Sequence, residues 1–191
     1  MAFSEHTYYQ EKFTKLSLTG ESIISKEFED CRFESSSFIN CIFTRIKFIN
    51  CIFNECILSA ITPTGSRFME VQFTKCKVLG FNWSKTDAIQ DMTFNECQLN
   101  YSDFSYLKIP KIKMLHCEAK EVDFTETDLS NSDLQNTDFE KSRFYNTNLS
   151  GADLRNARNY FIDVKNNVLK KTRFSYPEVI TLLHSLDIII E

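Results

Sequence analysis

Two sets of side chains in this sequence have the types that bind metals or catalyse reactions. Thiolate and imidazole are zinc ligands, and His116 stands directly beside Cys117. Paired carboxylates can divide the roles of general acid and general base, and eight acidic residues lie within residues 118–140 against Lys120 as the single base. Whether either set can do this chemistry depends on which side chains the fold brings together.

The chain repeats every five residues, most clearly from Val122 to Leu154, where it reads VDFTE, TDLSN, SDLQN, TDFEK, SRFYN, TNLSG. The first place in each five is small or β-branched, and the third place, here called the centre, is Phe or Leu. A period of five matches neither the 3.6 residues of a helix nor the 2 of a strand. Self-similarity at a fixed period indicates a solenoid.

The same register extends over nearly the whole chain. Of the 18 Phe residues, 15 fall on centres, and only Phe3, Phe81 and Phe161 do not. Pro63 breaks the run within a turn-like stretch, which predicts a small outward loop or a distorted corner. One extra residue precedes Phe94, which predicts a bulge within residues 84–93. The centres predicted to form the core include Phe33, Phe48, Phe53, Phe73, Phe94, Phe104, Phe124, Leu129, Phe139 and Phe144.

Cysteine tests this register independently, because every cysteine lies two residues before a centre. The seven are Cys31, Cys41, Cys51, Cys56, Cys76, Cys97 and Cys117. The last four follow one another at intervals of four repeats, with the one extra residue falling between Cys76 and Cys97, so they stack in one column if four repeats make a coil. We expect reduced, buried thiols rather than disulfides, because parallel side chains fit the disulfide torsion poorly. Whether the column has a redox role beyond packing stays open.

The period argues against both kinds of chemistry. Cys117 is expected to face inward and His116 outward, so the two do not easily share an ion. Asp123, Asp128 and Asp133 occupy successive second places and are expected to point into water on successive faces. The sequence also lacks a phosphate-binding loop and a nucleophile elbow. We therefore expect no catalytic residue, no metal, no cofactor and no enzymatic activity.

Length and charge limit the remaining functions. A chain of 191 residues indicates one domain, and it shows neither a signal-peptide pattern nor an apolar stretch long enough to span a membrane. We therefore expect a cytoplasmic protein that does not bind membranes. The net charge of −4, with the local excess of acid in residues 118–140, argues against direct nucleic-acid binding. It fits binding to a basic surface or simple solubility.

The segments TDLSN, SDLQN and GADLRN resemble the pentapeptide-repeat family, and the resemblance runs from about Phe13 to Phe174. It implies an all-β solenoid: a right-handed quadrilateral β-helix of about seven to eight coils over residues 1–174. With one strand spacing per coil, the rod is on the order of 34 Å long. The centres and the small first-place residues then fill the interior.

Residues 175–191 form a different segment, predicted to be a short helix followed by a strand. Pro177 and Glu178 are typical of a first helical turn, and an open solenoid end needs a cap. The tail resembles the C-terminal module through which Qnr and MfpA proteins dimerise, which implies a homodimer; the alternative is a purely intramolecular cap. The residues assigned to dimerisation are Val179, Leu182, Leu183, Leu186, Ile188 and Ile190.

The family resemblance also implies a function. Qnr, MfpA and McbG proteins act on DNA gyrase without catalysis, so the resemblance implies a DNA-mimicking modulator or protector of DNA gyrase or topoisomerase IV, of the fluoroquinolone or microcin resistance type. Duplex DNA carries roughly 20 charges over such a length, so mimicry by this chain would be local. The residues hypothesised to bind the partner are Glu118, Glu121, Asp123, Glu126, Asp128, Asp133, Asp138 and Glu140. The alternative is a rigid interaction scaffold with an unknown partner and no topoisomerase role.

Overall fold

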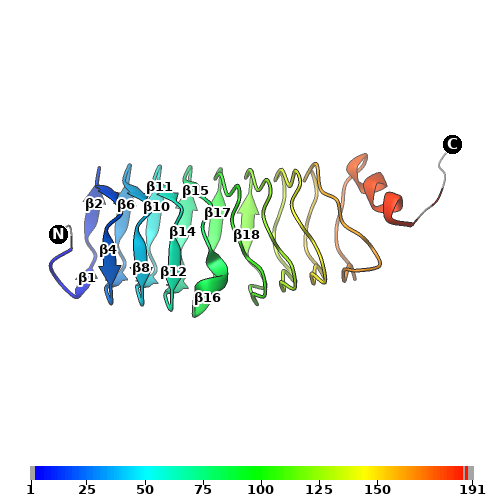
Figure 1. Ribbon diagram of the computed structural model, residues 1–191. Coiled ribbons are helices and arrows are strands. Elements are labelled where there is room, and N and C mark those ends of the chain that lie inside the picture. The colour runs from blue at the N-terminus through cyan, green and yellow to red at the C-terminus, as the bar shows by residue number, and fades with distance from the viewer. Residues whose placement is uncertain (1–2, 187, 189–191) are drawn as a thin grey trace.

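The computed structural model describes residues 3–186 and residue 188, and these form one straight, four-sided rod. Short strands pair in parallel with the strands one coil away, mostly four repeats along the chain, as in the pairing of Phe33 with Phe53. Figure 1 shows the coils stacked from the N-terminal end to a helix at the other end. The predicted parallel β-solenoid is thus confirmed.

Four sheets make the four faces of the rod, and every strand has three residues. Face 1 contains β1 (Thr7–Tyr9), β5 (Glu27–Glu29), β9 (Lys47–Ile49), β13 (Arg67–Met69) and β16 (Ala88–Gln90). Face 2 contains β2 (Lys12–Thr14), β6 (Arg32–Glu34), β10 (Ile52–Asn54), β14 (Gln72–Thr74), β17 (Thr93–Asn95) and β18 (Lys113–Leu115). Face 3 contains β3 (Ser17–Thr19), β7 (Ser37–Ile39), β11 (Ile57–Ser59) and β15 (Lys77–Leu79). Face 4 contains β4 (Ser22–Ile24), β8 (Ile42–Thr44) and β12 (Thr62–Thr64).

The regular strands make about five turns, and no sheet in the described part of the chain holds more than six strands. This count is lower than the seven to eight coils that the sequence predicts. Isolated bridges carry the same winding further. On face 2 they link Lys113 to Asp133, Asp133 to Asp153 and Asp153 to Arg173, so that each bridge spans four repeats. The rod therefore continues to the C-terminal end with bridges in place of strands.

The change from strands to bridges coincides with a change of residue type in the second place of the repeat. From Asp103 onward this place is often Asp or Asn, and its side-chain oxygen accepts a hydrogen bond from the N–H two residues on, as Asp123 does from Thr125 at 2.8 Å. A side chain that bonds the nearby backbone favours a turn over an extended strand. Lys113 fills the second place in strand β18, whereas Lys108 and Glu118 fill it at isolated bridges.

The centres fill the interior of the rod. On face 2, the rings of Phe33, Phe53 and Phe73 stack in parallel with centroid separations of 4.6 and 4.9 Å. Rings from adjacent faces meet edge to face, as Phe48 and Phe53 do at 5.3 Å. Offset stacking and edge-to-face contact are the arrangements that aromatic rings prefer. All ten predicted core residues are at most 5 % exposed, and Phe81, off the centres, is also buried.

The prediction at Pro63 is wrong, because no loop or distorted corner forms there. Pro63 is buried at the centre of β12 and pairs with Phe43. β12 is the last strand of the sheet on face 4, so the missing N–H lies where regular pairing stops. Edge strands are where a sheet tolerates proline.

The extra residue lies next to this edge, in the 3-10 helix η1 (Trp83–Lys85). The two residues bridged at Asn82 and Asp103 are separated by four repeats plus this extra residue. The residues of the later bridge, Gln98 and Glu118, are again four repeats apart. Trp83, the first residue of this helix, stacks on Phe104 with centroids 5.6 Å apart. The predicted bulge within residues 84–93 is therefore a single tight turn that begins one residue earlier.

Both ends of the register differ from the sequence-based prediction. The first coil begins earlier than Phe13, because β1 pairs with β5, and Phe3 covers that end by packing on Phe13 and Phe28. Near the other end, the five-residue spacing counted on from Leu154 predicts a centre at Asn159, but Asn159 is exposed with φ of 58°, and Tyr160 fills the interior instead. A polar amide is replaced inside by a ring, which buries more apolar area.

The C-terminal helix is η2 (Glu178–Leu186), a 3-10 helix that lies beyond the last coil (Figure 1). The strand predicted after it falls on residues outside the described part, apart from Ile188, which lies in no strand. Within residues 3–186, no helix is both long enough and apolar enough to cross a membrane.

Candidate protein-interaction surfaces

The cysteines belong to the interior hydrogen-bonding of the rod. The N–H of Cys56 donates to Sγ of Cys76 at 3.3 Å, and that thiol donates to the carbonyl oxygens of Phe53 and Thr74, both at 3.3 Å. All seven cysteines are free and buried. Burial raises the pKa of Cys51 to about 12, and a high pKa makes a thiol a poor nucleophile and a poor metal ligand at neutral pH.

The same column continues with hydroxyl groups in place of thiols. The N–H of Leu16 donates to Oγ of Ser36 at 3.1 Å, and the N–H of Cys117 donates to Oγ1 of Thr137 at 3.3 Å. His116 is exposed while Cys117 is buried, as the register predicts. Among the residues that the structure describes, no three His, Cys, Asp or Glu side chains gather where they could hold a metal ion.

The structure places the eight acids of the hypothesised partner site all around the rod. Glu118 and Asp138 bridge each other on face 3. The bridges put Asp123 on face 4, Asp128 on face 1 and Asp133 on face 2. The structure therefore does not bring the eight carboxylates together on one surface.

Four of these acids also have a structural task. Asp123, Asp128, Asp133 and Asp138 each accept a backbone N–H two residues on, at 2.8 to 3.3 Å. This bond recurs wherever the second place is Asp or Asn in the turn-like coils, as at Asp153. The spacing of these carboxylates therefore follows from turn formation. Turn formation also accounts for the regular spacing of their charges.

Cations from the neighbouring coil offset part of the acidic charge. Oδ2 of Asp138 lies 3.3 Å from Nε of Arg158 and 3.6 Å from Nζ of Lys120. Burial opposes ionisation of Asp138, but the hydrogen bonds from Asn159 and from the N–H of Glu140, together with the two cations, outweigh it and lower the pKa of this carboxyl.

Two acids remain well placed to meet a partner: Glu121 and Glu126. Both are exposed at corners, with φ of 53° and 55°. Glu121 follows face 3 and Glu126 follows face 4, so they border face 4 on its two sides. In the described part of the chain neither one makes an ion pair.

The residues assigned to dimerisation separate into two sides of η2. Leu182 is buried and Val179 packs against the core, and Oγ of Ser185 accepts the N–H of Val164 at 3.2 Å. Residues three apart share one side of a 3-10 helix, so this side caps the rod. Another side carries Leu183, half-buried, and Leu186, 38 % exposed. Ile188 is exposed and Ile190 lies outside the described residues.

Two models of known protein families match this chain. The model of the pentapeptide repeat region matches residues 26–104 and 46–124, and the model of eight copies of the pentapeptide repeat matches residues 122–158. The chain belongs to the pentapeptide-repeat family.

Solved structures show the same fold along the whole rod of this pentapeptide-repeat protein. Full-length QnrB1, described as a plasmid-mediated fluoroquinolone resistance protein, is 18% identical and superposes with a TM-score of 0.72 over 93% of this chain and 100% of that chain. A trypsin-treated variant of QnrB1 is 19% identical, with a TM-score of 0.69 over 97% of this chain and 91% of that one. A comparison with curated protein sequences finds no match.

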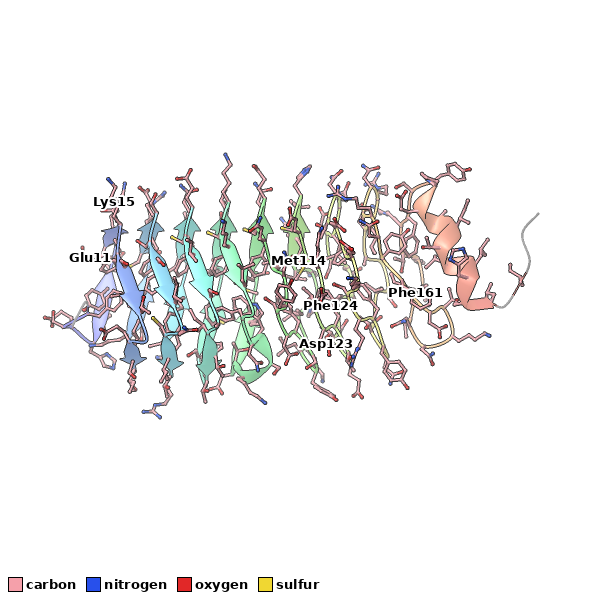
Figure 2. The ribbon with its side chains drawn as sticks, turned by 45° about the horizontal axis from the view of Figure 1, so that its top comes forward. Glu11, Lys15, Met114, Asp123, Phe124 and Phe161 are labelled. Atoms are coloured by element: carbon pink, nitrogen blue, oxygen red, sulfur yellow. The ribbon has the colours of Figure 1, made fainter. Side chains whose placement is uncertain are left out.

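Sequence reasoning missed a group of exposed aromatic residues around face 4. Tyr101, Tyr106, Tyr145 and Phe161 are 64%, 69%, 49% and 61% exposed. Figure 2 shows Phe161 toward the C-terminal end of the rod, beyond Asp123 and the buried Phe124. The register holds a clue, because the three tyrosines occupy outward places and Phe161 is one of three phenylalanines off the centres.

Proposed function

We propose that this pentapeptide-repeat protein works without catalysis, as a cytoplasmic protein that binds a type II topoisomerase, DNA gyrase or topoisomerase IV, and modulates or protects it. The observation that carries this proposal is the match of the whole rod to QnrB1, a fluoroquinolone resistance protein, with a TM-score of 0.72. The interior is filled by stacked rings and hydrogen-bonded thiols, which leaves the outer walls to meet the partner.

The charge distribution supports a basic partner surface and a local contact. Glu121 and Glu126 project at the two corners of face 4, one repeat apart, and Glu140 lies beside face 3, 3.1 Å from Nζ of Lys120. Carboxylates that have no ion pair of their own, such as those of Glu121 and Glu126, are free to pair with the arginines and lysines of a DNA-binding surface. DNA mimicry is proposed only for this band, because the net charge of the chain is −4.

We also propose that the protein forms a homodimer through its C-terminal end. Ile180, Leu183 and Leu186 are spaced three apart on the side of η2 that does not cap the rod, and Ile188 is 52% exposed. Apolar residues gathered on one exposed surface are typical of protein interfaces. Analytical ultracentrifugation tests this: Leu186→Asp is expected to give monomers, whereas Ile42→Asp, at a more exposed isoleucine on β8, leaves dimers. Monomers of the unmodified protein would exclude the dimer.

The topoisomerase proposal is tested by a DNA gyrase supercoiling assay with a fluoroquinolone, with and without this protein. We expect the protein to restore supercoiling in the presence of the drug or to inhibit gyrase directly. No effect at micromolar protein would contradict the proposal.

Two triple charge-reversal variants, one in residues 118–140 and one outside them, locate the contact. Glu121→Lys, Glu126→Lys and Glu140→Lys together are expected to abolish gyrase capture in a pull-down. The matched control is Glu55→Lys, Glu70→Lys and Glu96→Lys, which makes the same change of charge at three corners that precede residues 118–140 in the chain. Equal capture by both triple variants would exclude the acidic band as the contact.

A rigid scaffold for a different protein is the second candidate. The placement of the eight acids on four faces, with four of them used in turns, favours it. It predicts that the supercoiling assay shows no effect.

A further inference from the structure

A hollow with a volume of about 620 Å³ opens on face 4 near the C-terminal end of the rod. Its lining includes Phe144, Tyr145 and Phe161, with Lys141, Arg143 and Asp163 beside them. The volume falls within the range of about 300–1,000 Å³ that is typical of small-molecule sites. The described residues of η2 do not line this hollow.

A break in the winding creates this hollow. The preceding bridge on this face joins Asp123 to Arg143, which are four repeats apart. The next bridge joins Phe144 to Ile162, and this separation is two residues shorter than four repeats. The chain makes up the difference in residues 163–167, which form a small loop at the corner of the rod. Departures from the rules of a fold are expected mainly where function or strain requires them.

The loop is held in place by Asn167, so the hollow is already formed in the free protein. Its Nδ2 donates to the carbonyl oxygens of Phe144 at 3.1 Å and Asp163 at 2.9 Å, and its Oδ1 accepts the N–H of Thr147 at 2.9 Å. A pre-formed site loses less conformational entropy when it binds a ligand.

The apolar part of the lining consists of three aromatic side chains. Phe144 is 5% exposed, while Tyr145 and Phe161 are 49% and 61% exposed. Folding does not account for the exposure of Phe161, because every other phenylalanine of the rod is buried or packed against the core. Exposed ring faces beside a hollow can stack on a flat apolar ligand.

The polar part of the lining has unused positive charge. Nη1 of Arg143 lies 3.7 Å from Oδ2 of Asp123, which leaves its other N–H groups free, and Lys141 makes no ion pair in the described chain. The carboxylate of Asp163 is engaged within its own loop, by the N–H of Lys165 at 2.8 Å and by Nδ2 of Asn166. The groups left to bind a ligand are therefore cationic donors.

A third feature independently marks the same place. Oγ1 of Thr125, another lining residue, is buried and has no hydrogen-bond partner among the described residues. Buried polar atoms in folded proteins nearly always have a partner. An acceptor brought in by a ligand would satisfy this hydroxyl.

We propose that this hollow binds a small planar aromatic carboxylate, with the ring between Tyr145 and Phe161 and the carboxylate at Arg143 and Lys141. A guanidinium binds a carboxylate through two parallel N–H bonds, and the aromatic walls exclude water from the ring. This binding does not depend on the topoisomerase partner proposed above, because it needs no second protein.

The test is isothermal titration of the full chain with 2-naphthoate as the probe, without gyrase. We expect a Kd of about 1 mM or tighter. Phe161→Ala and the double variant Lys141→Gln, Arg143→Gln are each expected to raise it about tenfold. Tyr106→Ala is the matched control, because Tyr106 is 69% exposed at the border of the same face and lies outside the lining; it is expected to bind like the unmodified protein.

Three results would overturn the proposal: no heat with 2-naphthoate, affinity unchanged by Phe161→Ala, or equal affinity for the uncharged 2-naphthalenemethanol. A second probe separates the competing class of ligand. It is a short peptide with one phenylalanine between glutamates. Binding of the peptide with no binding of 2-naphthoate would overturn the small-molecule site and assign the hollow to a segment of a partner protein.

Discussion

The N–H of Cys56 donates to Sγ of Cys76, one coil further along the rod, at 3.3 Å. In the same column Ser36 accepts the N–H of Leu16, and Thr137 accepts that of Cys117. A first-place thiol or hydroxyl therefore ties its own coil to the coil before it, since it accepts an N–H from that coil and its single proton lies between carbonyl oxygens of the two coils.

Replacement of Cys76 tests this role. Cys76→Ser keeps a donor and an acceptor in place, so we expect a loss of less than about 1 kcal/mol in the free energy of unfolding. Cys76→Ala leaves the N–H of Cys56 buried without a partner and is expected to cost about 1–3 kcal/mol. Urea denaturation followed by circular dichroism measures both. Equal losses would show that only packing matters at this position.

The thiols are expected to be unreactive while the rod is folded. Burial raises the pKa of Cys51 to about 12, and hydrogen bonding with the neighbouring thiol of Cys117 raises the pKa of Cys97 to about 12. The thiolate is the reactive form, so a disulfide reagent at pH 8 should modify the native protein slowly and all seven thiols at once in guanidinium. Fast modification of the folded protein would contradict buried, protonated thiols.

Two phenylalanines give opposite expectations for the same substitution. Phe48 is 3% exposed and stacks on Phe28 and Phe68 with centroids 5.2 and 5.3 Å away, so Phe48→Ala is expected to lower the free energy of unfolding by about 3–5 kcal/mol. Phe161→Ala is expected to change it by less than about 0.5 kcal/mol, because the ring lies on the surface. Thermal unfolding of both variants is the measurement. A large loss for Phe161→Ala would give this ring a structural role.

Acid is expected to destabilise the coil around Asp138. The folded state lowers the pKa of this carboxyl, so its contribution is present above the unfolded pKa of about 4 and is lost as the pH falls through the folded value. Asp138→Asn should therefore be less stable than the unmodified protein at pH 7, and the difference should shrink at pH 3. Urea denaturation at the two pH values measures this. The control Glu121→Gln, at an exposed corner, should stay within about 0.5 kcal/mol of the unmodified protein at pH 7.

The architecture was predictable because the side chains that fill the rod recur at one spacing. Phe48, Phe53 and Phe124 lie inside as their register requires. Pro63 was misjudged because the sequence does not show on which side of a strand its missing N–H falls. The five-residue spacing fails at Asn159 because the register shifts by one there, and Tyr160 is buried in its place.

The surface was less predictable than the interior. The sequence shows that Asp123, Asp128 and Asp133 are evenly spaced, but it does not show that each one bonds the backbone two residues on. An interpretation based on charge alone therefore combined carboxylates from different faces. The hollow at Phe161 depends on a bridge that is two residues shorter than the ordinary coil, which is a tertiary feature without a local sequence signal.

The turn at η1 accommodates an added residue without shifting the register of the coils on either side. Phe73 and Phe94 still stack at 5.0 Å across it, and the next coil regains its ordinary step. This corner is consequently a suitable place to graft a short epitope after the buried Trp83, because the coils on either side are expected to stay in register.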